Sequence, residues 1–511
     1  MTTRPAADQD TWNGVALLLL ALCLLLFAWE SRCVHSQLDD SYISYRYAQN
    51  LADGHGLVFN VGERVEGFSN LLWTLLVAGG IALGGKAESI GHILGALSGA
   101  ALLVGTCLYA ALILPRDKQC LAGLAPALVL ASNSFASWTA SGLETSLFAA
   151  LVTFALIAQA TGRIGQATAL CVLATLTRPD GVLIAAVVVG WDFLSRLRKD
   201  PDLLRDLRTW LPGLTYAGSI LGLTCFRLVY YGEWVPNTFY AKVGGLPLSL
   251  GFWYVVSFLA DGPGLLLLAV PFSFRGERKP WPGALFTLIV LIYLVYVGGD
   301  VFKNGRFLLP VLPFLVAASL RGTLAVWTRV RIAGAALALC VPAFVIWSLF
   351  VSIVIAGPDP HLALRIDNLP HSAKREDARR FNFLTDDQVK AQVHHIAALP
   401  TPVDLVAHTA IGRFGYYSGL PVLDLLGLVD PRVARSSERG SGAKLPGHQR
   451  SNVEYVFSRN PDLIVIPHPK ARRDSFVLPA VAALWADPRL EERYRWDRKI
   501  KAYRRLMPDA E

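Results

Sequence analysis

The chain has 511 residues, of which 53% are hydrophobic and only 17% are charged. Soluble proteins carry about 25% charged residues, and the mean hydropathy of this chain is +0.42. Because soluble chains of this length divide into domains with polar surfaces, the composition excludes an ordinary cytosolic enzyme, a disordered chain, a collagen and a small disulfide scaffold. It predicts a polytopic α-helical membrane protein.

The formal net charge is +9. Lys and Arg concentrate in cytoplasmic loops and near lipid head groups of membrane proteins, so we expect a lipid bilayer as partner and no nucleic acid. All seven cysteines lie at or before Cys340, and no two of them have metal-ligand spacing. The sequence therefore predicts neither a disulfide framework nor a zinc site.

A transmembrane helix needs about 20 apolar residues, and we expect about eleven such helices. The first has only Arg4 as a basic flank, and Trp29 and Glu30 stand where a signal peptide would have small residues. We interpret it as an uncleaved anchor. The apolar segments are 14–29, 71–84, 90–114, 120–134, 142–160, 166–190, 211–231, 252–274, 282–298, 307–320 and 332–356.

The loops 191–210, 275–279 and 321–331 are rich in Lys and Arg, so the positive-inside rule places them in the cytoplasm. The turn at 179–181 interrupts an apolar run, which predicts broken helices that line a cavity. Counting spans places the loops 30–70, 232–250 and 298–306, and everything after residue 357, on the outer side of the membrane.

Charge becomes frequent near the C-terminus: residues 357–511 hold 24 of the 48 Lys and Arg and 19 of the 39 Asp and Glu. We therefore divide the chain into a transmembrane module, 1–356, whose first outer loop is 30–70, and an extracytoplasmic soluble α/β domain, 357–511. The expected elements of this domain are strands at 403–406 and 463–466, helices at 374–397 and 475–486, and a solvated loop at 432–450.

Two adjacent carboxylates, Asp39 and Asp40, open the first outer loop. Charges at a membrane surface are costly unless they are used. An Asp at a helix start is also an ordinary N-cap, but one Asp would satisfy the cap. The helix that follows places Tyr42, Arg46 and Gln49 on one face, and we favour a functional role for the pair.

The same loop continues through turn-rich stretches at 54–60 and 62–70. Irregular backbone of this kind cannot face lipid, so we place it at the interface. His55 lies between two glycines and is a loop residue more readily than a metal ligand.

The order of short motifs resembles the GT-C glycosyltransferases, and most closely the group of mycobacterial terminal β-(1→2)-arabinofuranosyltransferases and their bacterial relatives. Each motif alone is weak, and their common order carries the resemblance. The motifs are residues 39–48 (DDSYISYRYA), 51–60, 62–67, 141–145, 177–181, 236–242, 298–310, 415–419 and 424–431.

This resemblance implies transfer of a sugar from a polyprenyl-phosphate donor at the outer face of a bacterial inner (plasma) membrane. The acceptor would be a cell-envelope glycan, a lipid or a glycoprotein. Arabinofuranose is the expected sugar, and mannose or another hexose is the alternative within the superfamily.

The resemblance also favours Asp39 as the catalytic base. A carboxylate at head-group level can take the proton of the acceptor hydroxyl as the C–O bond forms, and a single base favours inversion. Asp40 would orient the acceptor, hold a divalent cation or cap the helix, and the two roles could be exchanged. No further metal ligand stands at a fixed spacing.

The departing phosphate requires cationic partners. The resemblance favours Arg306, with Lys303 and Lys242 as further contacts, and interfacial snorkelling is the alternative for these side chains. Two roles are open for Arg178 and Asp180, lining the cavity or stabilising the helix break through a local pair, and we favour the structural role for Asp180. Span counting places Glu144 on the wrong face. The other candidate substrate contacts are Tyr42, Arg46, His55, Glu66, Arg178, Asn237, Tyr240, Asp300, Tyr416 and Tyr417.

In the outer domain, His408, Arg413, Tyr416 and Tyr417 follow the first expected strand. Aromatic residues suit sugar faces but also fill small cores, so acceptor positioning and fold stability both remain open for them. Two other functions compete with transfer. One is a lipid-linked-sugar flippase, but such proteins often show two matched halves, and no internal symmetry is evident in this sequence. The other is an envelope-binding scaffold, which would leave Asp39 and Asp40 without a role.

Overall fold

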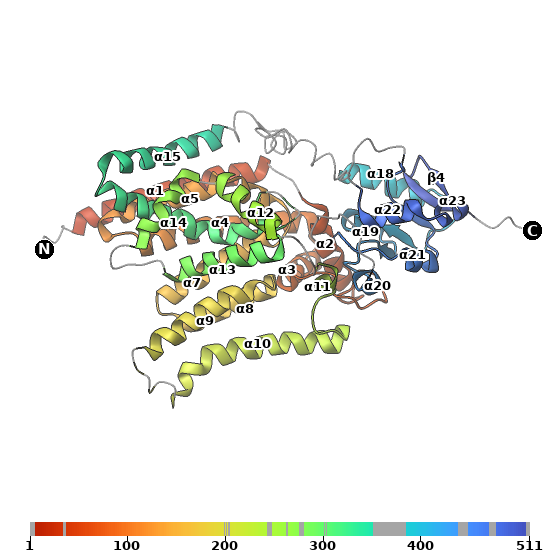
Figure 1. Ribbon diagram of the computed structural model, residues 1–511, viewed down its shortest axis with the longest axis horizontal. Coiled ribbons are helices and arrows are strands. Elements are labelled where there is room, and N and C mark those ends of the chain that lie inside the picture. Colours follow the sequence, from red (N-terminus) through yellow and green to blue (C-terminus); the bar gives the residue numbers. More distant parts are fainter. Residues whose placement is uncertain are drawn as a thin grey trace, which may run out of the picture. The chain divides into compact units, whose positions relative to one another are not determined.

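The structure is a computed structural model that describes residues 6–33, 37–198, 200, 202, 205–242, 248–261, 264–274, 281–300, 302, 304–350, 385–437, 448–469 and 477–506. Most of this described part is helical, and it contains one small sheet (Figure 1). The contacts divide the chain into two compact units, each made of three segments of the chain. The predicted combination of a helical body and a small α/β region is thus observed.

The first unit comprises Met1–Gln37, Gly91–Gly222 and Pro247–Leu369. Its regular elements are all helices within the described part, and its segments are apolar and carry few charges. Its elements are α1 (Ala6–Cys33), most of α4 (Ala87–Ile113), η1 (Arg116–Gly123), α5 (Leu124–Leu130), α6 (Asn133–Ala140), α7 (Thr145–Ala160), α8 (Ile164–Thr177), α9 (Gly181–Leu197), most of α10 (Leu207–Tyr231), α12 (Leu248–Asp261), η3 (Gly264–Phe274), α13 (Trp281–Val297), η4 (Arg306–Val311), α14 (Leu312–Trp327) and α15 (Arg331–Phe350).

The break predicted in the apolar run 166–190 is found between α8 and α9. Pro179 disfavours helical backbone at the residue before it, and Arg178 is accordingly extended, with φ −154° and ψ 138°. Gly181 opens α9 where an added Cβ would lie 2.5 Å from the backbone nitrogen of Thr175, so only glycine permits this close return of the chain.

Among the described residues, three helices are long and apolar enough to cross a membrane: Gly14–Arg32, Ala87–Ile113 and Arg306–Trp327. A further pair, Arg116–Leu130 and Asn133–Ala140, is bent by 66° at its break. The apolar segments expected at 120–134 and 252–274 are each divided between separate helical elements. The expected number of eleven spans is therefore not confirmed.

The second unit comprises Leu38–Ile90, Leu223–Leu246 and Pro370–Glu511. It combines helices from the first loop with the α/β region. Its further elements are α2 (Asp39–Ala52), α3 (Leu71–Ala82), α11 (Asn237–Lys242), α18 (Asp386–Ala397), β1 (Val406–His408), α19 (Ile411–Ser418), β2 (Val422–Asp424), α20 (Pro431–Ala434), α21 (Val453–Arg459), β3 (Leu463–Val465), α22 (Pro479–Ala486), α23 (Arg489–Arg493), β4 (Tyr494–Asp497) and β5 (Ala502–Arg505).

The sheet has the strand order β2-β1-β3-β5-β4. Strands β1, β2 and β3 are parallel, with Ala407 opposite Leu423 and Ile464, whereas β5 pairs antiparallel with β3 and β4. The chain leaves β1 through α19 to reach β2 and then returns to the other side of β1 as β3. The carboxyl end of β1, where α19 begins, is therefore a topological switch point.

The elements predicted for the C-terminal region are found with shifted bounds. β1 and β3 match the expected strands, but β1 begins at Val406 rather than at Val403. α18 begins at Asp386, after a capping box made by Thr385 and Gln388. The expected start of this helix at 374, the boundary at 357 and most of the loop 432–450 lie outside the described residues.

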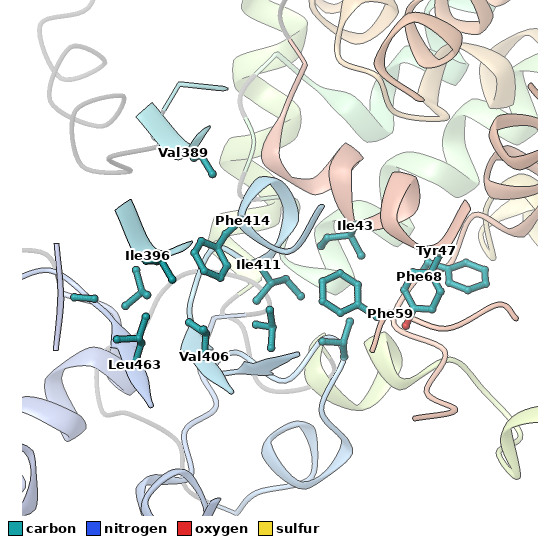
Figure 2. Packing of buried hydrophobic residues seen from close by; sticks show 14 of the residues in the cluster. Ile43, Tyr47, Phe59, Phe68, Val389, Ile396, Val406, Ile411, Phe414 and Leu463 are labelled. Atoms are coloured by element: carbon teal, nitrogen blue, oxygen red, sulfur yellow. The ribbon is translucent and has the colours of Figure 1, made fainter. Parts of the chain in front are cut away.

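The core of the second unit joins the first loop to the sheet (Figure 2). Ile43 and Phe59 from the first loop are buried in one cluster with Ile411 and Phe414 of α19 and Leu463 of β3. The loop at 38–70 thus packs as part of an α/β core and not as a solvated connection.

One glycine sets how closely α2 and α19 approach. A Cβ at Gly412 would overlap the carbonyl oxygen of Asp39. We expect Gly412→Ala to lower the stability by about 1–3 kcal/mol through overpacking, measured as thermal unfolding of the full chain in detergent. The matched control is Gly79→Ala in α3, where no atom lies within 4 Å of the added Cβ. Equal melting temperatures for the two variants would contradict the close packing.

Candidate active site

Asp39 lies in the first turn of α2 but does not cap that helix. The N-cap residue is Leu38, and no side chain caps the helix there. The Asp39 carboxylate instead accepts hydrogen bonds from two backbone N–H groups of α19, those of Gly412 (3.0 Å to Oδ2) and Arg413 (2.9 Å to Oδ1). It therefore caps a helix that lies more than 370 residues away in the sequence.

Burial determines the proton affinity of this carboxyl. Asp39 is 9% exposed, and its desolvation raises the pKa, an effect to which the charge of Asp40 adds. The N–H groups of α19 and the guanidinium of Arg413 oppose the rise but do not cancel it. A carboxylate with a raised pKa is a better proton acceptor than a solvated one.

Arg46 lies two turns after Asp39 on α2, about 10 Å further along the helix axis. Its guanidinium is buried and donates to carbonyl groups at the C-terminal end of α19, including Gly415 (2.5 Å) and Leu420 (2.8 Å), and to the carbonyl of Phe59 (2.6 Å). A cation is favourable at a helix C-terminus. Arg46, expected to contact substrate, is thus directed to the protein backbone.

Three tyrosines gather beside this helix pair. The rings of Tyr42, Tyr416 and Tyr417 lie with centroids 5.3–5.6 Å apart. The hydroxyl of Tyr416 donates to Glu88 at 3.3 Å, and the hydroxyl of Tyr417 lies 3.2 Å from the same carboxylate. The predicted aromatic candidates are therefore brought together, with their hydroxyls bonded to carboxylates of the protein.

Asp386 completes this cluster, and the sequence had not singled it out. One of its oxygens accepts from Tyr42 (2.6 Å) and Tyr417 (3.0 Å), and the other from the Arg413 guanidinium (2.5 Å). Burial alone would raise the pKa of Asp386, but the hydrogen bonds from Tyr42 and Arg413 outweigh it and hold the pKa below its ordinary value. The sequence placed Asp386 inside the helix expected at 374–397, and only the observed start of α18 puts it in the first turn.

Glu66 and Asn237 are bonded within the second unit. Both Glu66 oxygens accept from Arg227 of α10 at 2.9–3.1 Å. The Asn237 side chain donates to the carbonyls of Gly427 (2.8 Å) and Leu428 (2.9 Å). These contacts account structurally for two side chains that were expected to bind substrate.

The remaining candidates of this unit lie apart from the Asp39 cluster. His55 is exposed between two glycines of positive φ. Tyr240 is half-buried beneath the Arg435 guanidinium, 4.3 Å from its ring centroid, and Lys242 is exposed at the end of α11. Lys303 lies outside the described residues.

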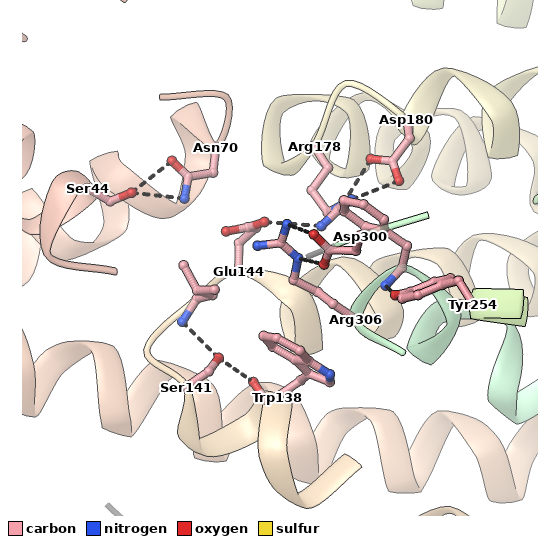
Figure 3. Close-up of polar contacts among 12 residues, drawn as sticks. Ser44, Asn70, Trp138, Ser141, Glu144, Arg178, Asp180, Tyr254, Asp300 and Arg306 are labelled. Carbon is pink, nitrogen blue, oxygen red and sulfur yellow. Dashed lines mark hydrogen bonds and ion pairs between the residues drawn. The ribbon is translucent and has the colours of Figure 1, made fainter. Parts of the chain in front are cut away.

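In the first unit, three of the sequence motifs converge on one cluster of buried charges (Figure 3). Arg178 binds Asp180 through two hydrogen bonds of 2.9 and 3.1 Å, which is the predicted local pair. Its third contact is Glu144 at 3.3 Å. Although span counting had separated Glu144 from Arg178, the structure places the two side chains side by side.

The third motif adds the pair of Asp300 and Arg306 to this cluster. Their charged groups lie 2.8 Å apart, and both side chains are at most 10% exposed. The ring of Phe307 contacts both arginines, with guanidinium carbons 4.4 Å (Arg178) and 4.7 Å (Arg306) from its centroid. Aromatic rings and paired carboxylates thus compensate two buried cations.

No group of three or more His, Cys, Asp or Glu side chains within the described ranges is arranged to hold a metal ion. Asp39 and Asp40 are adjacent in the sequence. In the described part of the chain, the Asp39 oxygens contact the backbone N–H groups of Gly412 and Arg413 and the guanidinium of Arg413.

The comparisons with known proteins agree with the resemblance found in the sequence. The chain is 30% identical over 350 residues to a terminal β-(1→2)-arabinofuranosyltransferase of Mycobacterium tuberculosis, covering 57% of this chain and 53% of the relative. It is 28% identical over 381 residues to the protein of the same name in Corynebacterium glutamicum, covering 62% and 53%. The predicted resemblance is confirmed. The chain spans about half the length of these curated relatives.

The solved structures show a shared fold. ArnT from Cupriavidus metallidurans in the apo state matches with a TM-score of 0.57 at 13% identity, over 96% of this chain and 97% of that chain. The same protein bound to undecaprenyl phosphate gives 0.54 at 14% identity, over 80% and 86%. AglB from Archaeoglobus fulgidus gives 0.54 at 11% identity, over 97% and 75%. A family model described as Domain of unknown function (DUF8728) matches residues 380–504.

His408 gives a pH-dependent test of the α/β core. Burial lowers its pKa to about 3 from 6.5, and its neutral Nδ1 accepts from the Ala410 N–H at 2.9 Å. Since the unfolded chain binds a proton below pH 6.5 and the folded one does not, stability is full above pH 6.5 and falls as the pH drops. Between pH 7 and pH 5, we expect the free energy of unfolding of the unsubstituted chain to fall by about 2 kcal/mol more than that of the His408→Gln variant.

The measurement is thermal unfolding of both proteins across this range. Asp424, the strand neighbour of His408, has its pKa raised by burial to about 6 and titrates in both proteins, so only their difference is interpreted. The control is His394→Gln, an exposed position on α18, which should follow the unsubstituted chain. The same pH dependence in all three proteins would contradict a neutral buried His408.

Proposed function

We propose that this chain is a GT-C membrane glycosyltransferase that transfers a sugar, arabinofuranose, from a polyprenyl-phosphate donor to a hydroxyl of a cell-envelope glycan. The observation that carries the proposal is a buried carboxylate, Asp39, held by hydrogen bonds from the N-terminus of α19. It is supported by the names of the curated relatives. Mannose or another hexose is the alternative donor sugar.

The reaction follows from the chemistry of such a donor. The acceptor hydroxyl oxygen bonds to the anomeric carbon, the bond from that carbon to the phosphate oxygen breaks, and the polyprenyl phosphate leaves with the electron pair. Asp39 takes the hydroxyl proton as the new bond forms. One base and a direct displacement give inversion at the anomeric carbon.

We place the donor phosphate near Arg306. Its guanidinium is already held by Asp300 and beside Trp138, 5.7 Å from the ring centroid, so it is oriented in advance and need not be ordered when the phosphate arrives. Lys242 and Lys303 remain candidates for the same phosphate. The ArnT structure bound to undecaprenyl phosphate supports a lipid phosphate as the ligand class.

The proposed topology has the loops 30–70, 232–250 and 298–306 and the domain 357–511 on the periplasmic side of a bacterial inner membrane, with about eleven spans. The basic loops identified in the sequence support this orientation. A polyprenyl tail can then stay in the bilayer while its phosphate lies at head-group level, and the acceptor arrives from water.

The first test concerns the two carboxylates. We expect Asp39→Asn to lower the rate of transfer about 10²–10⁴-fold, the usual contribution of a general base, and Asp40→Asn to lower it less. The assay follows transfer from polyprenyl-phosphate arabinofuranose to envelope glycans, with a polyprenyl-phosphate mannose arm for the alternative. The control is Asp53→Asn, an exposed carboxylate at the end of α2.

Full activity of both Asp39→Asn and Asp40→Asn would sink the assignment of the base. Transbilayer movement of the donor without transfer would favour a lipid-linked-sugar flippase instead. Thermal unfolding measured in parallel separates a lost base from a lost fold, because the amide introduced by Asp39→Asn keeps one of the two oxygens that bind α19.

The second test concerns the phosphate contact. We expect Arg306→Gln to raise the KM for the donor about 10- to 100-fold, the worth of one charge-assisted hydrogen bond. Because this change leaves the Asp300 carboxylate uncompensated, the double variant Arg306→Gln, Asp300→Asn is measured beside it. The raised KM should persist in the double variant. Recovery of the original KM would show that Arg306 serves only to neutralise Asp300.

A further inference from the structure

Arg413 lies between two carboxylates of the second unit. Its Nε donates to Asp386 at 2.5 Å, while its Nη1 lies 3.9 Å from Asp39. Its backbone N–H also donates to Asp39 at 2.9 Å. One residue therefore holds Asp39 through the backbone and shares its side-chain charge unequally between Asp39 and Asp386.

Asp386 is fixed independently of Arg413. Its second oxygen accepts from Tyr42 and Tyr417, and α18 holds it just after the capping box of Thr385 and Gln388. The Arg413 guanidinium also faces the Tyr42 ring, 5.0 Å from its centroid. The guanidinium is thus drawn toward α18 and the tyrosines, and away from full contact with Asp39.

This distribution matters because the interaction of two charges falls with their separation and rises in a buried site. A guanidinium in close contact with a carboxylate lowers the pKa of that carboxyl by about 1–3 units. At 3.9 Å, with its shortest contact to Asp386, Arg413 compensates Asp39 only in part. The carboxylate is then oriented without losing its affinity for a proton.

We propose that Arg413 is a positioning residue for Asp39, and that Asp386 sets the basicity of Asp39 by holding the Arg413 guanidinium. The inference rests on the proposed role of Asp39 as general base. It assigns a task in the reaction to each of two helices: α19 orients the carboxylate of Asp39, and α18, through Asp386, keeps that carboxylate basic. The charged groups that face Asp39 are Asp40 on its own helix and Arg413 on α19, with Asp386 of α18 acting through Arg413.

The proposal predicts opposite effects of two substitutions on the pH profile of transfer. Asp386→Asn frees the guanidinium to approach Asp39, so the acidic limb of the profile should move down by about one pH unit. Arg413→Gln removes the cation but keeps the backbone N–H, so the limb should move up by a similar amount. Arg413→Lys keeps a charge and should move the limb less than Arg413→Gln does.

The control is Arg435→Gln. Arg435 is an arginine of the same unit whose partner is Glu233 at 2.5 Å, and its loss should leave the limb in place. A substitution that only loosens the fold would lower kcat at every pH without moving the limb. Unmoved limbs in Asp386→Asn and Arg413→Gln, or limbs moved in one common direction, would overturn the proposal.

A second readout does not require transfer. Carbodiimide modifies protonated carboxyl groups, and mass spectrometry of the Asp39 peptide in an Asp40→Asn background reports the protonation of Asp39 against pH. Opposite shifts for Asp386→Asn and Arg413→Gln support the inference whether or not a donor is turned over. If the modification profiles shift in opposite directions but no donor sugar is transferred, only the proposed function is overturned. If transfer is normal but the profiles do not shift, only the inference about Arg413 and Asp386 is overturned.

Discussion

The carboxylate of Asp39 at the N-terminus of α19 is the interaction on which the second unit depends. Helix α19 has eight residues, too few to be stable alone. Asp39 binds the N–H groups at its start, and Arg46 binds the carbonyl groups at its end. Two charges on one face of α2 therefore complement both ends of the dipole of α19. This helix connects the neighbouring strands β1 and β2 of the sheet.

In the proposed mechanism this arrangement gives Asp39 two tasks. A carboxylate that anchors a helix must be buried and bonded, whereas a general base must keep a lone pair and an affinity for protons. Burial, which raises the pKa of Asp39, satisfies the second need, and the N–H groups of α19 satisfy the first. The guanidinium of Arg413 has its close contact with Asp386, which also binds Tyr42 and Tyr417. In our proposal this contact makes the two tasks compatible.

The first unit solves a related problem with different means. In an apolar body, each buried charge must be compensated. Arg178 is bound by Asp180 and Glu144, Arg306 by Asp300, and the ring of Phe307 contacts both guanidinium groups. Arg306, which we propose as the contact of the donor phosphate, is thus already paired with a carboxylate and an aromatic ring.

The sequence by itself determined the helical membrane class, two of the strands, the break at Pro179 and the local pair of Arg178 and Asp180, because composition, short-range spacing and proline geometry are all properties of neighbouring residues. It also identified Asp39 by the scarcity of charge around it. Only the tertiary structure decided that Arg46 and Glu66 bind the protein itself, that Glu144 meets Arg178, and that Asp386 stands behind Arg413. Such contacts join residues up to hundreds of positions apart, and no local periodicity records which distant partner will neutralise a buried charge.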